Sequence, residues 1–314
     1  MNQPPYPQPG QQAAMPGCWW HPNRATGLRC TRCDRPACPD CLREASVGYQ
    51  CIDCVQAGRQ ADRAQRRQYR GAGYGTRTVA GAVPAERAVV TPVLIAINLA
   101  LFVLTVIQAQ SLMQNELAPI EQDSMMWTPG VVFNGEWWRL LTSGFFHIGP
   151  LHVAVNMFSL WVLGRDIELL LGRVRFLAVY VLSLFGGSVA VMLFDQIDRP
   201  SAGASGAIYG LLGGLLVAVL RLRLNPVPAL VVIAVNIAIS IGIPNISLLA
   251  HLGGLVVGAL VTAAMVYAPE KNRAFWQAGA VALLAVALIG LVVYRDSEIS
   301  GMTCGYLRQV FVCR

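Results

Sequence analysis

Residues 203–220 read GASGAIYGLLGGLLVAVL, and this stretch decides the class of the protein. It is apolar over a length at the short end of what crosses a bilayer as a helix. Ser205 stands at its entrance within a Gly-x-Ser-Gly sequence. Gly206 and Gly210 are four residues apart, so they share one helix face and permit close approach of a neighbouring helix. The pattern therefore predicts a serine held close to a second helix.

The composition of the 314 residues indicates a membrane protein. Mean hydropathy is +0.50, 55% of the residues are hydrophobic and 13% are charged, against about 25% charged in average proteins. Seven apolar runs can cross a bilayer as helices, at roughly 89–109, 150–168, 174–194, 205–220, 226–243, 247–268 and 274–294. We predict an all-α polytopic membrane protein with seven transmembrane helices.

The charged residues predict how the chain is oriented. No signal-peptide pattern precedes the first run, so we expect residues 1–88 to be cytoplasmic. The short loops that then lie inside hold Arg165, Arg173, Arg175, Arg221, Arg223, Lys271 and Arg273. By the positive-inside rule this favours a multi-pass protein of the cell membrane with its C-terminus outside. The polar segment 110–146 is expected to lie in the outer interface, with Trp138 and Arg139 anchored to headgroups.

Seven of the nine cysteines form a metal-binding pattern near the N-terminus. The four pairs, each with two intervening residues, are Cys18 and His21, Cys30 and Cys33, Cys38 and Cys41, and Cys51 and Cys54. Eight such ligands fill two tetrahedral zinc sites, and full protein coordination predicts structural ions. Disulfides are the competing interpretation, but an odd cysteine count and a cytosolic location disfavour them. The spacing resembles a treble-cleft or B-box-like cross-brace, in which the first and third pairs share one ion and the second and fourth share the other.

The predicted domain order follows from these patterns. It comprises a disordered N-terminus (1–17), a double zinc-binding module (18–54), a basic flexible linker (55–88), a six-span core (89–268), a seventh transmembrane helix (269–295) and an outer tail (296–314). The net charge of +7 comes largely from arginines beside the first span, where topology and anionic lipids explain them, so no nucleic-acid partner is expected. Cys304 and Cys313, left over from the zinc set, are a candidate disulfide in the outer tail.

Three histidines and the Gly-x-Ser-Gly sequence fall at corresponding depths. His147 and His152 open the second span, Ser205 opens the fourth, and His251 lies early in the sixth. Spans two, four and six all enter from the outer side, so these residues share one layer below the outer surface. Ionisable residues in a span are costly and mark function by default. A serine nucleophile needs a base and oxyanion donors; His251 is the candidate base, and His152 and Asn156 are candidate donors.

The motifs together resemble the rhomboid family of intramembrane serine proteases, over roughly Pro92 to Tyr267. The matching elements are Trp138-Arg139, His147-x-x-x-x-His152-x-x-x-Asn156, Gly164-x-x-x-Glu168, Gly203-Ala204-Ser205-Gly206 with Tyr209, and Ala250-His251-x-x-Gly254-x-x-x-Gly258. The resemblance implies a Ser205–His251 dyad without an acid, and Tyr209 stacked on the imidazole. It also implies an oxyanion site that involves His152, Asn156 and the backbone about Gly203 and Ser205. Glu168 is interpreted as an anchor of the inner loop.

The expected function is cleavage of single-span membrane proteins near the outer face of the bilayer. The zinc module is expected to serve interaction or regulation, with a cytosolic protein as candidate partner. One alternative is a catalytically weak rhomboid-like protein that binds membrane clients. A transporter with a histidine proton relay is a second alternative, disfavoured because no inverted repeat is apparent. A zinc protease lacks its His-Glu-x-x-His pattern.

Overall fold

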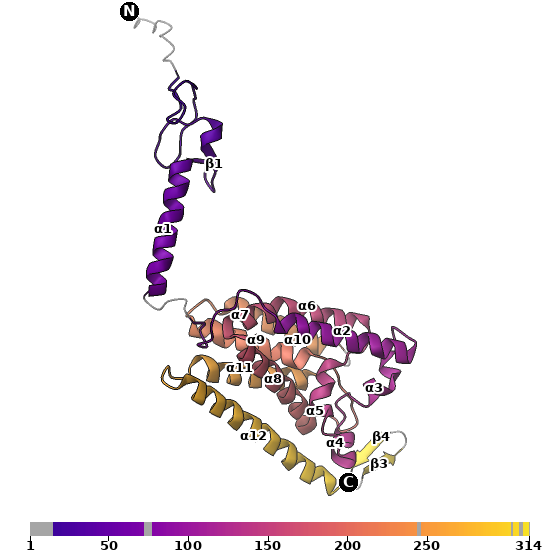
Figure 1. Cartoon of the computed structure of the whole chain (residues 1–314). Coiled ribbons are helices and arrows are strands. Elements are labelled where there is room, and N and C mark those ends of the chain that lie inside the picture. The colour runs from indigo at the N-terminus through magenta and orange to yellow at the C-terminus, as the bar shows by residue number, and fades with distance from the viewer. Residues whose placement is uncertain (1–14, 72–76, 244–245, 303, 308–309, 314) are drawn as a thin grey trace, which may run out of the picture. The chain divides into compact units, whose positions relative to one another are not determined.

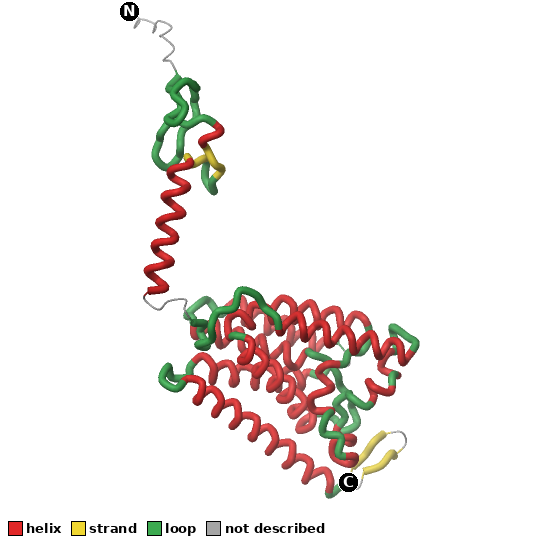
Figure 2. The backbone as a smooth tube through the Cα atoms, in the orientation of Figure 1, coloured by secondary structure: helices red, strands yellow, loops and turns green. Residues whose placement is uncertain are grey.

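The computed structural model describes residues 15–71, 77–243, 246–302, 304–307 and 310–313. It divides into two compact units, Met1–Gly75 and Thr76–Arg314, each described by itself below (Figure 1). Residues 1–14, which make up most of the expected disordered N-terminus, lie outside the described residues. Helices dominate the second unit, and its strands are confined to one C-terminal hairpin (Figure 2).

The N-terminal unit has little regular structure apart from one helix. A 3₁₀ turn, Pro39–Cys41, leads into strand β1 (Leu42–Glu44), which pairs antiparallel with β2 (Tyr49–Cys51). Its buried core consists mainly of cysteines, together with Ala37 and Leu42. A core this small and this rich in sulfur cannot supply the apolar burial of an ordinary domain. Another source of stability is therefore required.

The structure corrects the expected flexible linker. Helix α1 (Ile52–Gly71) covers the first half of the segment 55–88. The cause is local, because this stretch consists largely of alanine, arginine and glutamine, which are strong helix formers. The end of the segment packs on the helical body, where Ala80 is completely buried. Arginine content alone was a poor indicator of flexibility.

The helical body follows the predicted order of apolar runs. Its principal helices are α2 (Val90–Ala109), α6 (Pro150–Ser159), α7 (Arg165–Leu171), α8 (Arg173–Phe194), α9 (Ser205–Arg221), α10 (Val227–Gly242), α11 (Leu248–Val266) and α12 (Arg273–Ser300). A π-helical stretch, Leu160–Gly164, joins α6 to α7. All seven predicted spans are therefore helical, the second of them assembled from α6, the π-helical stretch and α7.

Helices α8, α9 and α11 form the centre of the body, and glycines bring them together. A Cβ on Gly254 would collide with the backbone of Gly206, and one on Gly258 would collide with Gly210. Neither position tolerates a larger residue, because the obstacle is backbone. The small-residue stripes predicted from the sequence are thus the contact surface between α9 and α11.

Glu168 determines where α2 begins. Its two carboxylate oxygens accept hydrogen bonds from the backbone N–H groups of Val89, Val90 and Thr91, at 2.7–2.9 Å, and from the Thr91 hydroxyl at 2.8 Å. These N–H groups are the ones that a helix start leaves unpaired. A charged acceptor makes each such bond worth about 1.5–3 kcal/mol. Glu168 was expected to anchor the inner loop; its hydrogen bonds hold the start of α2.

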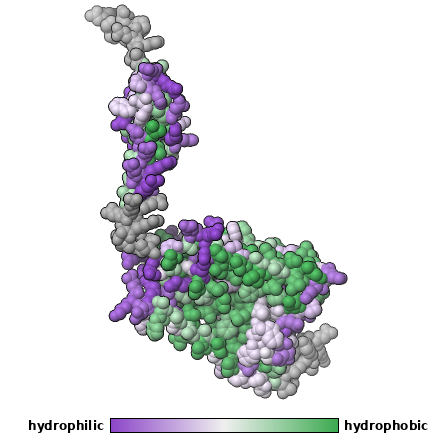
Figure 3. Space-filling model, in the orientation of Figure 1, coloured by the Kyte–Doolittle hydropathy of each residue, from purple (hydrophilic) through white to green (hydrophobic). Residues whose placement is uncertain are grey.

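Four of the described helices are long and apolar enough to cross a membrane, namely α2, α8, α11 and α12; a bent pair, Arg139–Phe145 with Pro150–Leu171, would be a fifth. Helices α9 and α10 have 17 and 16 residues, or about 25 Å each at the α-helical rise. That is short of a hydrocarbon core of about 30 Å. Apolar side chains form a broad surface band on the body, with hydrophilic residues toward its ends (Figure 3).

The segment between the first two spans folds into short helices: α3 (Pro119–Gln122), α4 (Thr128–Asn134) and α5 (Arg139–Thr142). Arg139 does not reach outward to headgroups, which corrects the sequence-based expectation. It is 4% exposed, pairs with Glu136 at 2.6 Å and donates to the Met125 carbonyl at 2.9 Å. Trp138 is half exposed and donates to the Asp123 carbonyl at 3.0 Å. Arg139 is therefore an internal brace of the segment.

The chain ends in a hairpin of β3 (Cys304–Leu307) and β4 (Val310–Cys313). The strands pair antiparallel, and their backbone register places Cys304 directly opposite Cys313. Directly opposed residues of such a pair are neighbours across the ladder. The candidate disulfide between Cys304 and Cys313 stays a prediction. The backbone register is compatible with it.

Candidate active site and candidate metal centre

Ser205 and His251 meet at the starts of two neighbouring helices. Ser205 is the first residue of α9, and His251 lies in the first turn of α11. His251 Nε2 is 2.7 Å from Ser205 Oγ, a good hydrogen-bond distance. The glycine contacts between α9 and α11 allow this approach. The structure brings together the two residues that the sequence singled out.

Two further side chains hold the His251 ring. Tyr209 stacks on it, with ring centroids 4.0 Å apart and an interplanar angle of 12°. Ser240 Oγ lies 2.7 Å from His251 Nδ1 and 2.7 Å from the Tyr209 hydroxyl, and it donates to the Asn236 carbonyl at 2.8 Å. A hydroxyl has one proton and two acceptor positions. Ser240 therefore accepts from Tyr209 and from His251 Nδ1–H, which leaves Nε2 unprotonated toward Ser205.

Ser240 was not predicted from the sequence, although a signal was present. Asn236 and Ser240 are four residues apart in the otherwise apolar run 226–243, so both lie on one face of α10. Polar side chains in a membrane helix usually face the interior of the bundle. That face could have been assigned to the site, but nothing in the sequence named His251 as its target.

His152 and Gly203 face each other across the entrance of α9. The Ile148 N–H donates to His152 Nδ1 at 3.3 Å, which places the ring proton on Nε2. Gly203 has φ +130°, and a Cβ there would lie 2.7 Å from His152 Nε2. Its N–H donates to the Ser143 carbonyl at 2.9 Å. Asn156 is buried on α6, and its Nδ2 donates to the His152 carbonyl at 3.0 Å.

His147 supports the site without facing Ser205. It is fully buried, and its Nε2 accepts from the Ala204 N–H at 3.3 Å. Its ring centroid is 5.1 Å from that of His152. Of the three predicted histidines, His251 contacts the serine, His152 lies opposite Gly203, and His147 holds the backbone just before the serine.

Asn115 was also missed, and it ties this region to the loop after α2. Its Nδ2 lies 2.7 Å from the His147 carbonyl and 2.7 Å from Glu121 Oε2, and its Oδ1 accepts from the Gly149 N–H at 2.7 Å. Glu121 is completely buried, and this burial raises its pKa to about 7. The segment 110–146 was expected to be an interface loop, so a buried network there was not predicted.

A cavity of about 860 Å³ opens onto the pair. Ser205 and His251 line it together with His152 and Asn156. Apart from the histidines, Arg199 is its one charged lining residue in the part of the chain that the structure describes. A carboxylate is thus absent from the described lining.

The cysteine pairs of the N-terminal unit come together as two separate groups. Cys18 and His21 meet Cys38 and Cys41, while Cys30 and Cys33 meet Cys51 and Cys54; within each group the donor atoms lie within 4.8 Å of one another. This arrangement confirms the cross-brace that the spacing suggested. Backbone N–H groups also point at sulfur, from Cys51 to Cys30 at 3.2 Å and from Cys54 to Cys51 at 3.4 Å. Both groups fit a metal ion.

Comparisons with known proteins agree with this geometry. The rhomboid domain family matches residues 134–268. The putative rhomboid protease YdcA of Bacillus subtilis is 36% identical over 146 residues, which cover 45% of this chain and 73% of that protein. The chain belongs to the rhomboid family. The rhomboid protease GluP of B. subtilis is 38% identical over 170 residues, 52% of this chain and 33% of the relative. RHOMBOID-like protein 1 of Arabidopsis thaliana is 39% identical over 147 residues, 45% of this chain and 37% of the relative.

The rhomboid match covers only part of what the structure shows. Ser205, His251, His152 and Ser240 fall inside residues 134–268, whereas Asn115 and the whole N-terminal unit fall outside. The chain spans about a third of the length of the first two relatives, GluP and RHOMBOID-like protein 1.

Proposed function

We propose that this rhomboid is an intramembrane serine endopeptidase that cleaves single-span membrane proteins near the outer face of the membrane. The observation that carries the proposal is the 2.7 Å contact between His251 Nε2 and Ser205 Oγ at the wall of an open cavity. Serine becomes nucleophilic only with a base in hydrogen-bond reach. The relatives named as rhomboid proteases support the same reaction.

The proposed acylation step uses the unprotonated Nε2 of His251. Ser205 Oγ attacks the carbonyl carbon of a substrate peptide while its proton moves to Nε2. His251 then donates that proton to the leaving amine as the C–N bond breaks, which leaves an acyl group on Ser205. A water molecule, deprotonated in turn by His251, releases the acid and restores the serine.

The oxyanion of the tetrahedral intermediate needs donors already in place. His152 fits this role because its Nδ1 is an acceptor for Ile148 N–H, so its Nε2–H is free to donate. Asn156 belongs to the same helix face and is the second proposed donor, after release from the His152 carbonyl. Gly203 keeps space open beside His152 Nε2.

Ser240 is proposed as the positioning residue for His251. It accepts a hydrogen bond from Nδ1–H, which fixes the tautomer and gives the imidazolium a neutral partner when Nε2 is protonated. In triads with an acid, a carboxylate does this at the same nitrogen. A hydroxyl supplies the geometry without a buried charge, which suits a membrane interior.

The two cysteine-rich groups are proposed to hold two structural zinc ions. Three thiolates with one imidazole, or four thiolates, are the usual donors for tetrahedral zinc, and no position is left open for water. The proposed orientation has the module in the cytosol, where thiols stay reduced. A cytosolic protein is its proposed partner.

The test uses the purified full chain in detergent with a single-span substrate and a fluorophosphonate probe. Wild type should cleave and be labelled, whereas Ser205→Ala and His251→Ala should do neither. Ser183→Ala is the matched control, since this buried α8 hydroxyl has no partner among the described residues; it should behave as wild type. Cleavage by Ser205→Ala at the wild-type rate would refute the proposal. Binding of the substrate by wild type without cleavage or labelling would favour a client-binding protein.

A further inference from the structure

A turn just before α2 lies against the starts of two membrane helices. The Thr78 N–H donates to the Ala82 carbonyl at 2.8 Å, and the Gly81 N–H donates back to Thr78 at 2.8 Å. Gln277 on α12 donates to the Ala80 carbonyl at 2.9 Å. Gly172, at the start of α8, lies so close to Ala82 that a Cβ on it would collide. The turn therefore fills the corner between α8 and α12.

Three arginines converge on this corner. Arg77 donates to the Gly81 carbonyl at 3.0 Å. Arg273 lies against the same glycine, with its Cδ and Nη1 2.7 Å from where a Gly81 Cβ would stand. Arg175 donates through Nε to Gln277 at 2.8 Å, and the charges of both Arg77 and Arg273 act on it.

No anion in the described structure balances this arginine cluster. None of the ion pairs found among the described residues involves Arg77, Arg175 or Arg273. Glu168 on α7 is engaged by the start of α2 and pairs with Arg173 at 4.0 Å. Arg273 Nε is buried without a hydrogen-bond partner. Like charges this close repel, so the cluster is more stable with an anion bound.

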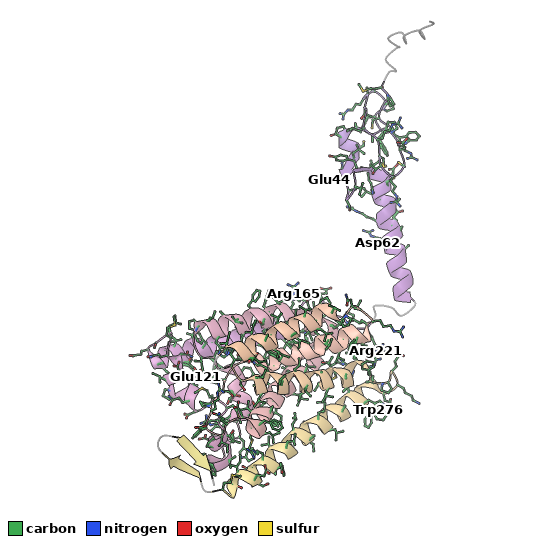
Figure 4. All side chains as sticks on the ribbon, turned by 180° about the vertical axis from the view of Figure 1, so that it is seen from behind. Glu44, Asp62, Glu121, Arg165, Arg221 and Trp276 are labelled. Carbon is green, nitrogen blue, oxygen red and sulfur yellow. The ribbon has the colours of Figure 1, made fainter. Side chains whose placement is uncertain are left out.

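The cluster lies at the end of the body opposite to Ser205. Helix α9 begins at Ser205 and ends at Arg221, which donates to the Val266 carbonyl at the end of α11. The labelled Arg221 and Trp276 lie toward one end of the body in Figure 4, and Glu121 lies toward the other. Trp276 and its neighbour Phe275 are 54% and 72% exposed. Tryptophan side chains of membrane helices are enriched at headgroup level.

We propose that Arg77, Arg175 and Arg273 form a binding site for one phosphate-bearing anion at this end of the membrane body. Guanidinium groups bind phosphate through paired, charge-assisted hydrogen bonds. The depth marked by Trp276 makes an anionic lipid headgroup one source of the phosphate and a free phosphate ion the other. Binding joins the turn before α2 to α8 and α12, so it stabilises the helical body.

The test measures the Tm of the purified full chain in uncharged detergent. Three titrants are compared: short-chain phosphatidylglycerol, short-chain phosphatidylcholine and sodium phosphate. Phosphatidylglycerol should raise the Tm of wild type saturably, because binding to the folded state stabilises it, and phosphatidylcholine should not. An equal shift with sodium phosphate supports a free-phosphate site; a shift with the lipid alone supports a headgroup site.

Variants decide whether the arginine cluster is responsible. Arg77→Gln should weaken the apparent affinity about tenfold, the usual effect of one charged hydrogen bond, and Arg77 is exposed, so folding should persist. The triple variant with Arg175→Gln and Arg273→Gln should lose the saturable shift. Arg223→Gln removes one exposed charge at the same end and should match wild type. Equal shifts in wild type, Arg77→Gln and the triple variant, or no saturable shift in wild type, would overturn the proposal.

Discussion

In the N-terminal module the candidate ligand side chains are the core, whereas in the helical body the proposed reactive side chains are carried by a core of apolar helices. Cysteines make up most of what is buried in the module. In the body, large aromatic residues such as Phe176 and Tyr180 are fully buried, and Ser205 and His251 lie at the starts of α9 and α11. The difference predicts that folding of the module depends on its metal, and that the body stays folded when residues of its site are changed.

Metal removal is the largest expected effect and separates the two units. A chelator should strip about two zinc ions per chain, the capacity of eight tetrahedral ligands, and the module should unfold. Binding of structural zinc is worth about 10–16 kcal/mol, far more than so small a core supplies. Cleavage of a membrane substrate should continue. The measurements are zinc content, limited proteolysis of residues 18–54 and peptidase rate.

Cys30→Ser should reproduce the loss of one ion. A module that stays protease-resistant at zero metal content would contradict the proposed role. A peptidase rate that falls in step with zinc would show instead that the two units are coupled.

Gly203→Ala tests how much the site depends on backbone shape. The new Cβ would collide with His152 Nε2, and φ +130° strains any residue other than glycine by about 1–3 kcal/mol. Displacing one oxyanion donor should lower kcat about 10²–10³-fold. The Tm of the body should fall only modestly, since the position lies outside the helix core. Wild-type kcat in this variant would exclude His152 Nε2 from the reaction.

Ser240→Ala tests the hydroxyl behind His251. We expect kcat to fall about 10–100-fold, less than for loss of a reacting group, because Tyr209 still stacks on the ring. The pH–rate profile should also move, since Nδ1 loses its acceptor; a purely structural defect would leave that profile in place. Ser183→Ala again serves as the control for loss of a buried hydroxyl. An unchanged profile would reduce Ser240 to a packing role.

Glu121→Gln should have the smallest effect, confined to the pH dependence of stability. Burial raises the pKa of Glu121 from 4.5 to about 7, so the folded state binds the proton more tightly than the unfolded state does. The resulting stability is fully present below pH 4.5 and is lost as pH rises through about 7. The glutamine variant should flatten this decline in thermal melts recorded from pH 4.5 to 8. The same slope in both proteins would assign the decline to other groups.

Much of the fold was predictable because bilayers impose strong rules on sequence. Apolar run length placed the helices, and the glycine spacing in 203–220 predicted the α9–α11 contact. The prediction of a flexible linker was wrong for the part that forms α1. Its arginine-rich composition was interpreted as flexibility, but the helix propensity of the same residues prevailed. The prediction for Arg139 was also wrong. A cation next to an interfacial tryptophan was assigned to headgroups, but Arg139 is buried and bonds to Glu136 and a nearby backbone carbonyl.

The sequence by itself determined the candidate reactive residues and the candidate metal ligands, because their chemistry and spacing are local. The tertiary structure alone decided which partners complete them. Ser240 reaches His251 from a third helix, and Asn115 reaches His147 across 32 residues. Arg77, Arg175 and Arg273 are dispersed along the chain and meet only at one corner. Hydrogen bonds and charges act over a few ångströms in space, whatever the separation in sequence.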